Sequence, residues 1–255
     1  MFQKVKQNPR QVLDSLKFRA LNSFRYSGYR RFIVLTRSRT GSNLLVSFLN
    51  SHPNISAEGE LFNRLNGRNY EKILATVFAS QPYQTKAKGF KIFYYHPNDD
   101  DASKLWHDLV NMDNLYVIHL KRRNILRTLV SRKIAELRRQ WQVVDSSDIE
   151  SKQKRRVRLT VEELLNGFQS TRNWESAGDE MFSEHPLMPV YYENLVEEPE
   201  AIFEEISGFL GVRYVQPQTP LKKQNPEKTS ELVVNFEELK DAFTGTEWQP
   251  FFEES

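Results

Sequence analysis

The sequence predicts an α/β protein with a P-loop-like three-layer fold, in which helices flank a central parallel sheet. Three observations support this fold class. Short apolar segments that suit buried strands alternate with longer segments of helical periodicity. Polar or basic turns directly follow two of the strands. The chain has 255 residues, which is enough for one core, so we expect a single domain over residues 1–255 with a long helical insertion.

The elements are expected in the following order. Residues 1–30 form a helical lead-in, and four apolar segments follow as strands. The capping-box pair Thr160 and Glu163 predicts a helix start. Pro199 suits the first turn of a later helix that ends near Gly211. The polar stretch 145–154 is expected to be a loop, and residues 215–255 form a C-terminal segment. The expected strands are Phe32 to Leu35, Gly89 to Tyr94, Leu115 to Leu120 and Met188 to Tyr192.

The most informative segment runs from Phe32 to Leu49, FIVLTRSRTGSNLLVSFL. An apolar strand leads through a short turn directly into an apolar helix. The N–H groups and the dipole at such a helix start bind phosphate-like anions. An ordinary turn is the alternative, but two close arginines would repel each other unless an anion binds there. The expected anion ligands are Arg37, Ser38, Arg39, Thr40, Gly41, Ser42 and Asn43.

A second turn of this kind follows the apolar segment Leu115 to Leu120. Asn124 can cap a helix whose apolar side chains recur at helical spacing as far as Trp141. Arg123 offers a planar guanidinium for a phosphate, and Ser131 adds a hydroxyl donor eight residues later. Two anion-binding turns at the carboxyl ends of strands suit one ligand with two separate phosphate-type ends.

These two turns resemble the cofactor signature of the sulfotransferases that use 3′-phosphoadenosine 5′-phosphosulfate (PAPS). In that family a strand, loop and helix with an R/K-S/T-G-S/T-T/S core binds the 5′-phosphosulfate, and Arg39 to Asn43 match it. A later R-x7-S segment binds the 3′-phosphate, and Arg123 to Ser131 match it. The arginine-type loop and the NSHP segment are similar to bacterial carbohydrate and glycolipid sulfotransferases, including the trehalose 2-sulfotransferase group. Two later segments, Tyr192 to Gly211 and Lys222 to Leu239, also resemble that family.

The resemblance implies in-line transfer of a sulfuryl group from PAPS to a hydroxyl of a small-molecule or glycan acceptor, without a metal, and release of adenosine 3′,5′-bisphosphate. Arg39 occupies a position where many relatives have lysine, and it would neutralise charge on the leaving phosphate oxygen. Glu60 corresponds to the carboxylate of a G-E segment and would be the general base, with Glu58 as the alternative. A solvated surface glutamate is the other interpretation of Glu60. Lys222 and Lys223 would contact the 3′-phosphate.

Several other polar residues have a structural and a functional interpretation. His52 and His119 could be bases, but a helix-exit turn and a strand interior favour structural roles. Lys91 could face the donor or acceptor, although a lysine at a strand end is usually solvated. The basic run could hold an acidic acceptor, but a solvated face is the favoured interpretation. This run consists of Lys152, Lys154, Arg155, Arg156 and Arg158.

Composition and absent motifs narrow the function classes. The chain has no cysteine, which excludes disulfides and thiolate zinc sites. No apolar run approaches the ~20 residues that span a bilayer, and the N-terminus lacks the apolar core of a signal peptide, so we expect a cytoplasmic protein without membrane insertion. A nucleotide kinase would need a Walker lysine and a Mg²⁺-holding carboxylate, and neither motif is found. A polyanion-binding module would need aromatic residues among the basic run, so we expect no nucleic-acid partner. The sequence leaves the oligomeric state open.

Overall fold

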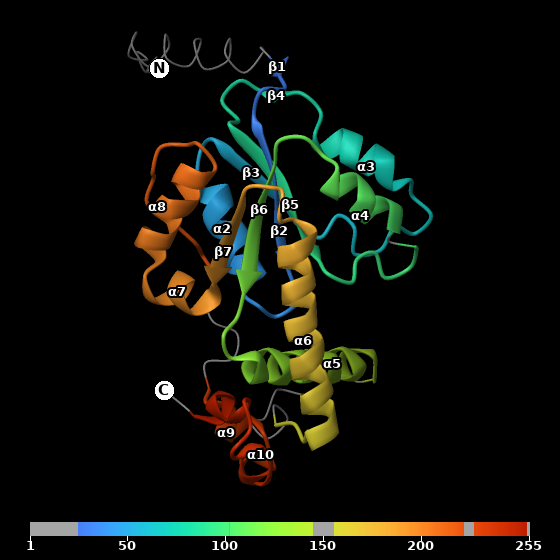
Figure 1. Cartoon of the computed structure of the whole chain (residues 1–255), viewed down its shortest axis with the longest axis vertical. Coiled ribbons are helices and arrows are strands. Elements are labelled where there is room, and N and C mark those ends of the chain that lie inside the picture. Colours follow the sequence, from blue (N-terminus) through green and yellow to red (C-terminus); the bar gives the residue numbers. More distant parts are fainter. Residues whose placement is uncertain (1–24, 102, 145–155, 222–226, 254–255) are drawn as a thin grey trace, which may run out of the picture.

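The computed structural model describes residues 25–101, 103–144, 156–221 and 227–253. Its centre is a five-stranded, wholly parallel sheet with the strand order β3-β5-β2-β6-β7 (Figure 1). A short antiparallel pair, β1 (Arg25–Tyr26) with β4 (Gln81–Pro82), lies outside this sheet. The predicted α/β fold with a central parallel sheet is confirmed. The strands are β2 (Arg30–Thr36), β3 (Ile55–Glu58), β5 (Ala87–Phe93), β6 (Leu115–Lys121) and β7 (Leu187–Tyr191).

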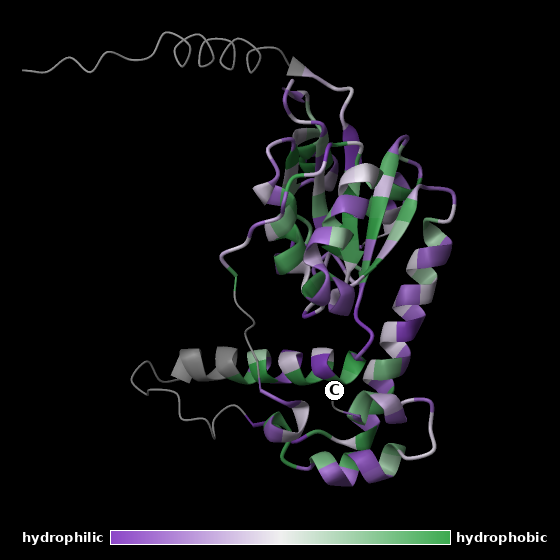
Figure 2. Cartoon of the chain, turned by 90° about the vertical axis from the view of Figure 1, so that its left-hand side faces the viewer, coloured by the Kyte–Doolittle hydropathy of each residue, from purple (hydrophilic) through white to green (hydrophobic). Residues whose placement is uncertain are grey.

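Helices cover both faces of the sheet, as the sequence predicts (Figure 1). Along β2, Phe32 and Val34 pack in one cluster and Ile33 and Leu35 in another, because successive strand residues point to opposite faces. Figure 2 shows the hydrophobic residues concentrated along these strands. One face is covered by α2 (Ser42–Ser51), α7 (Tyr192–Glu197) and α8 (Pro199–Phe209), and the other by α3 (Tyr70–Val77) and α4 (Ser103–Val110).

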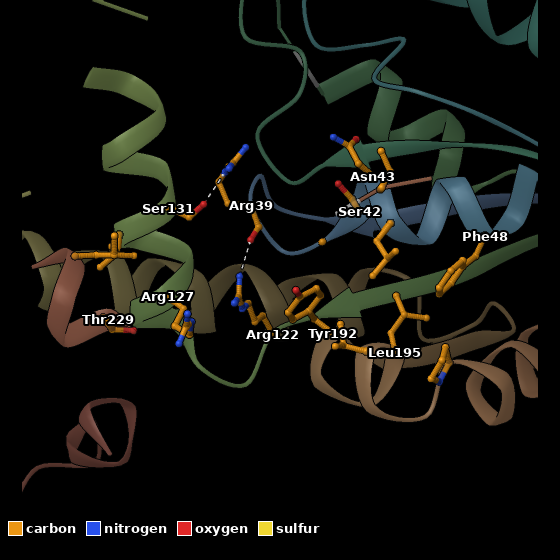
Figure 3. Close-up of a pocket in the computed structure, with 17 residues that line it drawn as sticks. Arg39, Ser42, Asn43, Phe48, Arg122, Arg127, Ser131, Tyr192, Leu195 and Thr229 are labelled. Carbon is orange, nitrogen blue, oxygen red and sulfur yellow. Dashed lines mark hydrogen bonds between the residues drawn. The ribbon is translucent and has the colours of Figure 1, made fainter. Parts of the chain in front are cut away.

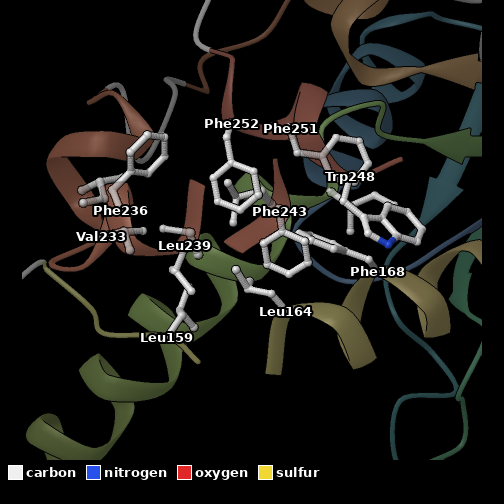
Figure 4. Close-up of a cluster of buried hydrophobic side chains, with 14 of the residues drawn as sticks. Leu159, Leu164, Phe168, Val233, Phe236, Leu239, Phe243, Trp248, Phe251 and Phe252 are labelled. Atoms are coloured by element: carbon white, nitrogen blue, oxygen red, sulfur yellow. The ribbon is translucent and has the colours of Figure 1, made fainter. Parts of the chain in front are cut away.

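A separate group of helices packs below the carboxyl ends of the strands (Figure 1). Phe168 of α6 (Val161–Met181) lies at its centre, and its ring centroid is 5.5 Å from that of Phe243, 5.2 Å from that of Trp248 and 5.0 Å from that of Phe251 (Figure 4). These aromatic contacts attach the C-terminal segment to α6, the long helix that precedes β7. The group comprises α5 (Ile125–Val144), α6 (Val161–Met181), α9 (Thr229–Leu232), α10 (Phe236–Phe243) and the 3₁₀ helix η2 (Gln249–Phe252).

Two predicted helix boundaries are confirmed. The Thr160 hydroxyl accepts a hydrogen bond from the Glu163 backbone N–H, and the Glu163 carboxylate accepts one from the Thr160 N–H, which starts α6. Pro199 occupies the first turn of α8, and Gly211 follows that helix with a φ of 67°. The predicted N-terminal helix, the loop 145–154 and the side chain of Trp141 lie outside the described residues.

Candidate active site

The loop between β2 and α2 occupies the switch point of the sheet. β2 is the central strand, with β5 on one side and β6 on the other, and ligands of such sheets bind at the carboxyl ends of the strands where the order reverses. Gly41 is the N-cap of α2 with a φ of 91°, and a Cβ there would lie 2.2 Å from the ring of Tyr192. Only glycine fits this turn. The first N–H groups of α2 have no partner within the helix and can bind an anion.

A cavity of about 400 Å³ opens beside this turn (Figure 3). It is formed by both predicted anion-binding segments, because loop residues face Ser131 and two arginines from the β6–α5 segment. Its volume lies in the usual range for small-ligand sites. Apolar side chains, among them Phe48 and Leu195, form another part of its wall. The polar lining comprises Arg39, Gly41, Ser42, Asn43, Arg122, Arg127, Ser131, Tyr192 and Thr229.

Direct hydrogen bonds join the two segments (Figure 3). Arg39 Nε donates to Ser131 Oγ at 3.0 Å, and Arg122 Nη1 donates to the Arg39 carbonyl oxygen at 3.2 Å. Arg39 has a φ of 68°, a left-handed conformation that is uncommon for residues other than glycine. The loop therefore holds the Arg39 side chain at the β6–α5 segment, within the cavity.

Arg122 and Arg127 line the cavity, although the sequence analysis did not select them. The Arg122 guanidinium stacks on the Tyr192 ring at 4.4 Å, and burial lowers the pKa of Arg122 despite the nearby Tyr192 and Glu193. Its buried Nε has no hydrogen-bond partner within the described part of the chain. Arg127 Nη2 donates to the Glu227 carbonyl oxygen at 2.8 Å. The sequence could not choose among adjacent arginines because the choice depends on the path of the turn.

Arg123 and Arg37 point elsewhere. The exposed Arg123 donates to Asn194 Oδ1 at 2.6 Å and lies 4.6 Å over the Tyr191 ring. Arg37 is buried, donates to Thr171 Oγ1 of α6 and lies 5.5 Å from the Trp174 ring. Neither side chain lines the cavity, so in this structure both arginines attach the two turns to neighbouring helices.

The remaining loop residues are placed as follows. The Ser38 backbone N–H donates to the Tyr95 hydroxyl at 3.2 Å. Thr40 is buried, and its hydroxyl has no hydrogen-bond partner among the described residues, which leaves it available to a bound anion. Lys222, Lys223, Lys152, Lys154 and Arg155 lie outside the described residues. Arg156 and Arg158 are exposed, as expected for a solvated face.

Glu60 lies in a cluster of polar side chains next to the loop. Its Oε1 is 3.0 Å from Lys91 Nζ, and its Oε2 accepts a hydrogen bond from Asn63 Nδ2 at 3.2 Å. The same Lys91 ammonium donates to Asn43 Oδ1, in the first turn of α2. Lys91 is 5% exposed, so it is not the solvated strand-end lysine that the sequence favours. A buried cation thus joins Glu60 to the wall of the cavity.

Glu58 faces a different part of the surface. Its carboxylate pairs with Lys88 Nζ, and both residues line a groove beside α3 together with Leu61 and Lys72. No residue of this groove lines the cavity at the loop. Of the two candidate glutamates, Glu60 is therefore the one whose contacts lead to the cavity.

Both candidate histidines have structural contacts. His52 Nδ1 accepts from the Asn54 N–H at 3.1 Å, and its Nε2 bonds the Arg213 carbonyl oxygen at 2.9 Å. His119 Nε2 bonds the Tyr94 hydroxyl and its Nδ1 bonds Asp179 Oδ1, each at 2.7 Å. Their ring nitrogens are occupied, which supports the structural interpretation of both residues.

Acidification is expected to destabilise the fold through His119. Burial lowers the pKa of His119 to about 4, and the Lys121 ammonium adds to this effect while Asp179 opposes it. An unfolded histidine titrates near 6.5, so the unfolded chain binds more protons between these values. Stability should therefore fall by up to about 3 kcal/mol as the pH drops from 6.5 to 4. Glu175 opposes part of this loss because burial raises its pKa.

Urea unfolding at pH 7 and pH 4.5 measures this loss. The variant His119→Asn keeps a polar group near Asp179 but cannot be protonated, so its stability should depend less on pH. An equal pH dependence in both proteins would contradict the assignment to His119.

Comparisons with known proteins give similarities of sequence and of fold. No protein-family model matches the chain. A protein named Nodulation protein H from Rhizobium tropici is 27% identical over 241 residues, covering 87% of this chain and 92% of the relative. A protein of the same name from Rhizobium meliloti (strain 1021) is 27% identical over 237 residues, covering 87% and 94%. The structure of a sulfotransferase from Alicyclobacillus acidocaldarius aligns with 86% of this chain and 91% of its own, with a TM-score of 0.51 and 13% identity.

The chain is similar in sequence to the nodulation proteins over most of its length, and in fold to the sulfotransferase from Alicyclobacillus acidocaldarius. Its five-stranded parallel sheet with flanking helices is the sulfotransferase-like α/β fold. The match to the nodulation proteins extends over nearly the whole chain and is not confined to one motif. Within the described ranges, the protein has no group of three side chains that could hold a metal ion, and none of its helices is long and apolar enough to cross a membrane.

Proposed function

We propose that this enzyme transfers a sulfuryl group from PAPS to a hydroxyl of a carbohydrate or glycolipid. The observation that supports the proposal is that the two predicted anion-binding turns meet in one cavity, beside a glutamate that a buried lysine holds near the loop. A donor with phosphate-type groups at both ends matches two turns better than a ligand with one anionic end.

The residues of the cavity suit the parts of PAPS. The N–H groups of the α2 first turn, the Thr40 hydroxyl and Arg39 would hold the phosphosulfate. Ser131, with Arg122 and Arg127, would hold the 3′-phosphate. The apolar wall would exclude water from the nucleoside. These roles are supported by the residues that line the cavity and by the Thr40 hydroxyl, which has no hydrogen-bond partner among the described residues.

The reaction requires a general base for the acceptor hydroxyl and a positive charge at the leaving oxygen. Glu60 would accept the proton of the acceptor hydroxyl, whose oxygen forms the new O–S bond. The bond between sulfur and the bridging phosphate oxygen breaks, and Arg39 would neutralise the charge that grows on that oxygen. Lys91 would keep Glu60 next to the loop, since its ammonium contacts both Glu60 and Asn43.

The acceptor class rests on two similarities. The arginine-type loop and the NSHP segment, Asn50 to Pro53, resemble bacterial carbohydrate and glycolipid sulfotransferases. The relatives named Nodulation protein H match nearly the full chain. A panel of trehalose, a chitooligosaccharide and a lipo-chitooligosaccharide, each incubated with labelled PAPS, tests this class. Transfer to none of the three would contradict it.

Adenosine 3′,5′-bisphosphate is expected to stabilise the protein more than ATP does, because it presents a 3′-phosphate to Ser131 and its neighbours. A hundredfold excess of this nucleotide over its dissociation constant should add about 2.7 kcal/mol of stability. Thermal unfolding with each nucleotide measures the difference. Equal or larger stabilisation by ATP would favour a kinase-type site and contradict the assignment.

Removing Arg127 is expected to weaken the binding of adenosine 3′,5′-bisphosphate by ~1.5–3 kcal/mol, the usual contribution of a hydrogen bond to a charged group. Arg123→Ala is the matched comparison, because this arginine lies four residues away and contacts Asn194 instead of the cavity. Calorimetric titration of both variants decides between them. A larger loss of affinity in Arg123→Ala would instead assign the 3′-phosphate contact to Arg123, the first residue of the R-x7-S segment.

A further inference from the structure

The His96 imidazole is a buried group beside Glu60 that the proposed reaction does not use. It lies in the turn after β5, is 1% exposed, and has its ring centroid 4.7 Å from that of Phe93. Trp106 of α4 donates its indole N–H to the His96 carbonyl oxygen at 2.9 Å. Packing and this hydrogen bond therefore hold both the backbone and the ring in place.

The two ring nitrogens of His96 have different partners. Nδ1 accepts a hydrogen bond from the Phe93 backbone N–H at 3.3 Å, so the neutral ring carries its proton on Nε2. Nε2 lies 4.0 Å from Glu60 Oε2. The nitrogen that faces the carboxylate is thus the donor. A movement of about 1 Å in the partly exposed Glu60 side chain brings the two atoms to hydrogen-bond distance.

The other contacts of Glu60 leave a defined place for this donor. Lys91 holds Oε1 at 3.0 Å, whereas Oε2 has only a long hydrogen bond of 3.2 Å from Asn63 Nδ2 among the contacts described. Asn63 itself is fixed, because its Oδ1 accepts from Asn98 Nδ2 at 2.8 Å. A second donor on Oε2, the third on the carboxylate, would restrict the rotation that one contact on each oxygen still allows.

We propose that His96 is a positioning residue that donates its Nε2–H to Glu60 Oε2 and so orients this carboxylate toward the acceptor hydroxyl. The inference rests on the proposed function, since it takes Glu60 as the general base. His96 does not itself accept the acceptor proton, because Nδ1 is occupied by Phe93 and Nε2 already carries a proton.

Burial keeps the His96 ring neutral, and two charged groups, Glu60 and Lys91, face it with opposite effects. Burial lowers the pKa of His96 to about 4; Glu60 opposes this shift and Lys91 adds to it. At neutral pH the imidazole therefore orients Glu60 as an uncharged donor. Protonation of His96 would therefore lower turnover only well below pH 6.

Two substitutions separate positioning from a merely structural role. Gln places an N–H where Nε2 lies, and Asn places an acceptor where Nδ1 lies. His96→Gln should keep turnover within about threefold of the wild type, whereas His96→Asn should lower kcat by about 10- to 100-fold with little change in the KM for PAPS. If His96 instead acts only by accepting the hydrogen bond of the Phe93 N–H, His96→Asn should keep more turnover than His96→Gln. That order would overturn the proposal.

A second measurement does not depend on activity or on the folding of either variant. The ¹⁵N chemical shifts of the imidazole in the wild-type protein should show the Nε2–H tautomer at pH 7, and they should change in Glu60→Gln. A ring protonated on Nδ1, or shifts that Glu60→Gln leaves unaltered, would refute the contact. Absence of sulfuryl transfer by the wild type would instead contradict the proposed function, and the tautomer would still be decided by these shifts.

Discussion

Replacing Arg39 by alanine is expected to lower turnover by ~10²–10³, the usual effect of removing one donor that acts in the transition state. Arg39 lines the cavity, and its backbone and side chain are held by Arg122 and Ser131. A cation fixed in this way needs little rearrangement when charge develops on the leaving oxygen. Affinity for adenosine 3′,5′-bisphosphate should change less than kcat, because the charge at the leaving oxygen grows during the reaction.

The matched control is Arg39→Lys. A lysine keeps the positive charge but loses the planar guanidinium that reaches Ser131, so this variant should keep more activity than the alanine variant. Single-turnover assays with labelled PAPS measure the chemical step apart from product release. A wild-type rate in Arg39→Ala would remove this residue from the reaction.

Strong local patterns predicted most of the fold. The apolar segments at β2, β5, β6 and β7 stand out because strands buried on both faces are continuously apolar. β3 was missed because its sequence, ISAE, has only four residues and no apolar run. Its pairing depends on tertiary context: the Asn50 side chain at the end of α2 bonds both the N–H and the carbonyl oxygen of Ala57 on this edge strand.

The sequence identified the two turns that meet at the cavity but not the direction of each side chain. The two motifs predicted that Arg39 and Ser131 belong to one site, and the structure places both residues in the cavity. The sequence alone does not distinguish Arg122 from Arg123, since a shift of one residue along a turn changes the direction in which the side chain points. The contacts of Lys91 and His96 with Glu60 were also beyond sequence reasoning, because they join β5 and its following turn to residues about 30 positions earlier.

Glu60→Gln should bind PAPS normally yet transfer sulfate more slowly by ~10²–10⁴, because the amide keeps the shape of the carboxylate but cannot accept the acceptor proton. Its contacts give a reason to expect normal binding. Glu60 touches Lys91, Asn63 and His96 and does not itself line the cavity. The loss should therefore appear in kcat.

Glu58→Gln is the matched control for this experiment. The two glutamates are two residues apart, but the Glu58 carboxylate pairs with Lys88 in the groove beside α3. Its substitution should leave the rate of transfer near that of the wild type, because no contact of Glu58 leads to the loop. Calorimetry with adenosine 3′,5′-bisphosphate and single-turnover transfer to a working acceptor compare both variants with the wild type. A normal rate for Glu60→Gln together with a slow Glu58→Gln would move the base to Glu58, and with it the acceptor to the groove beside α3.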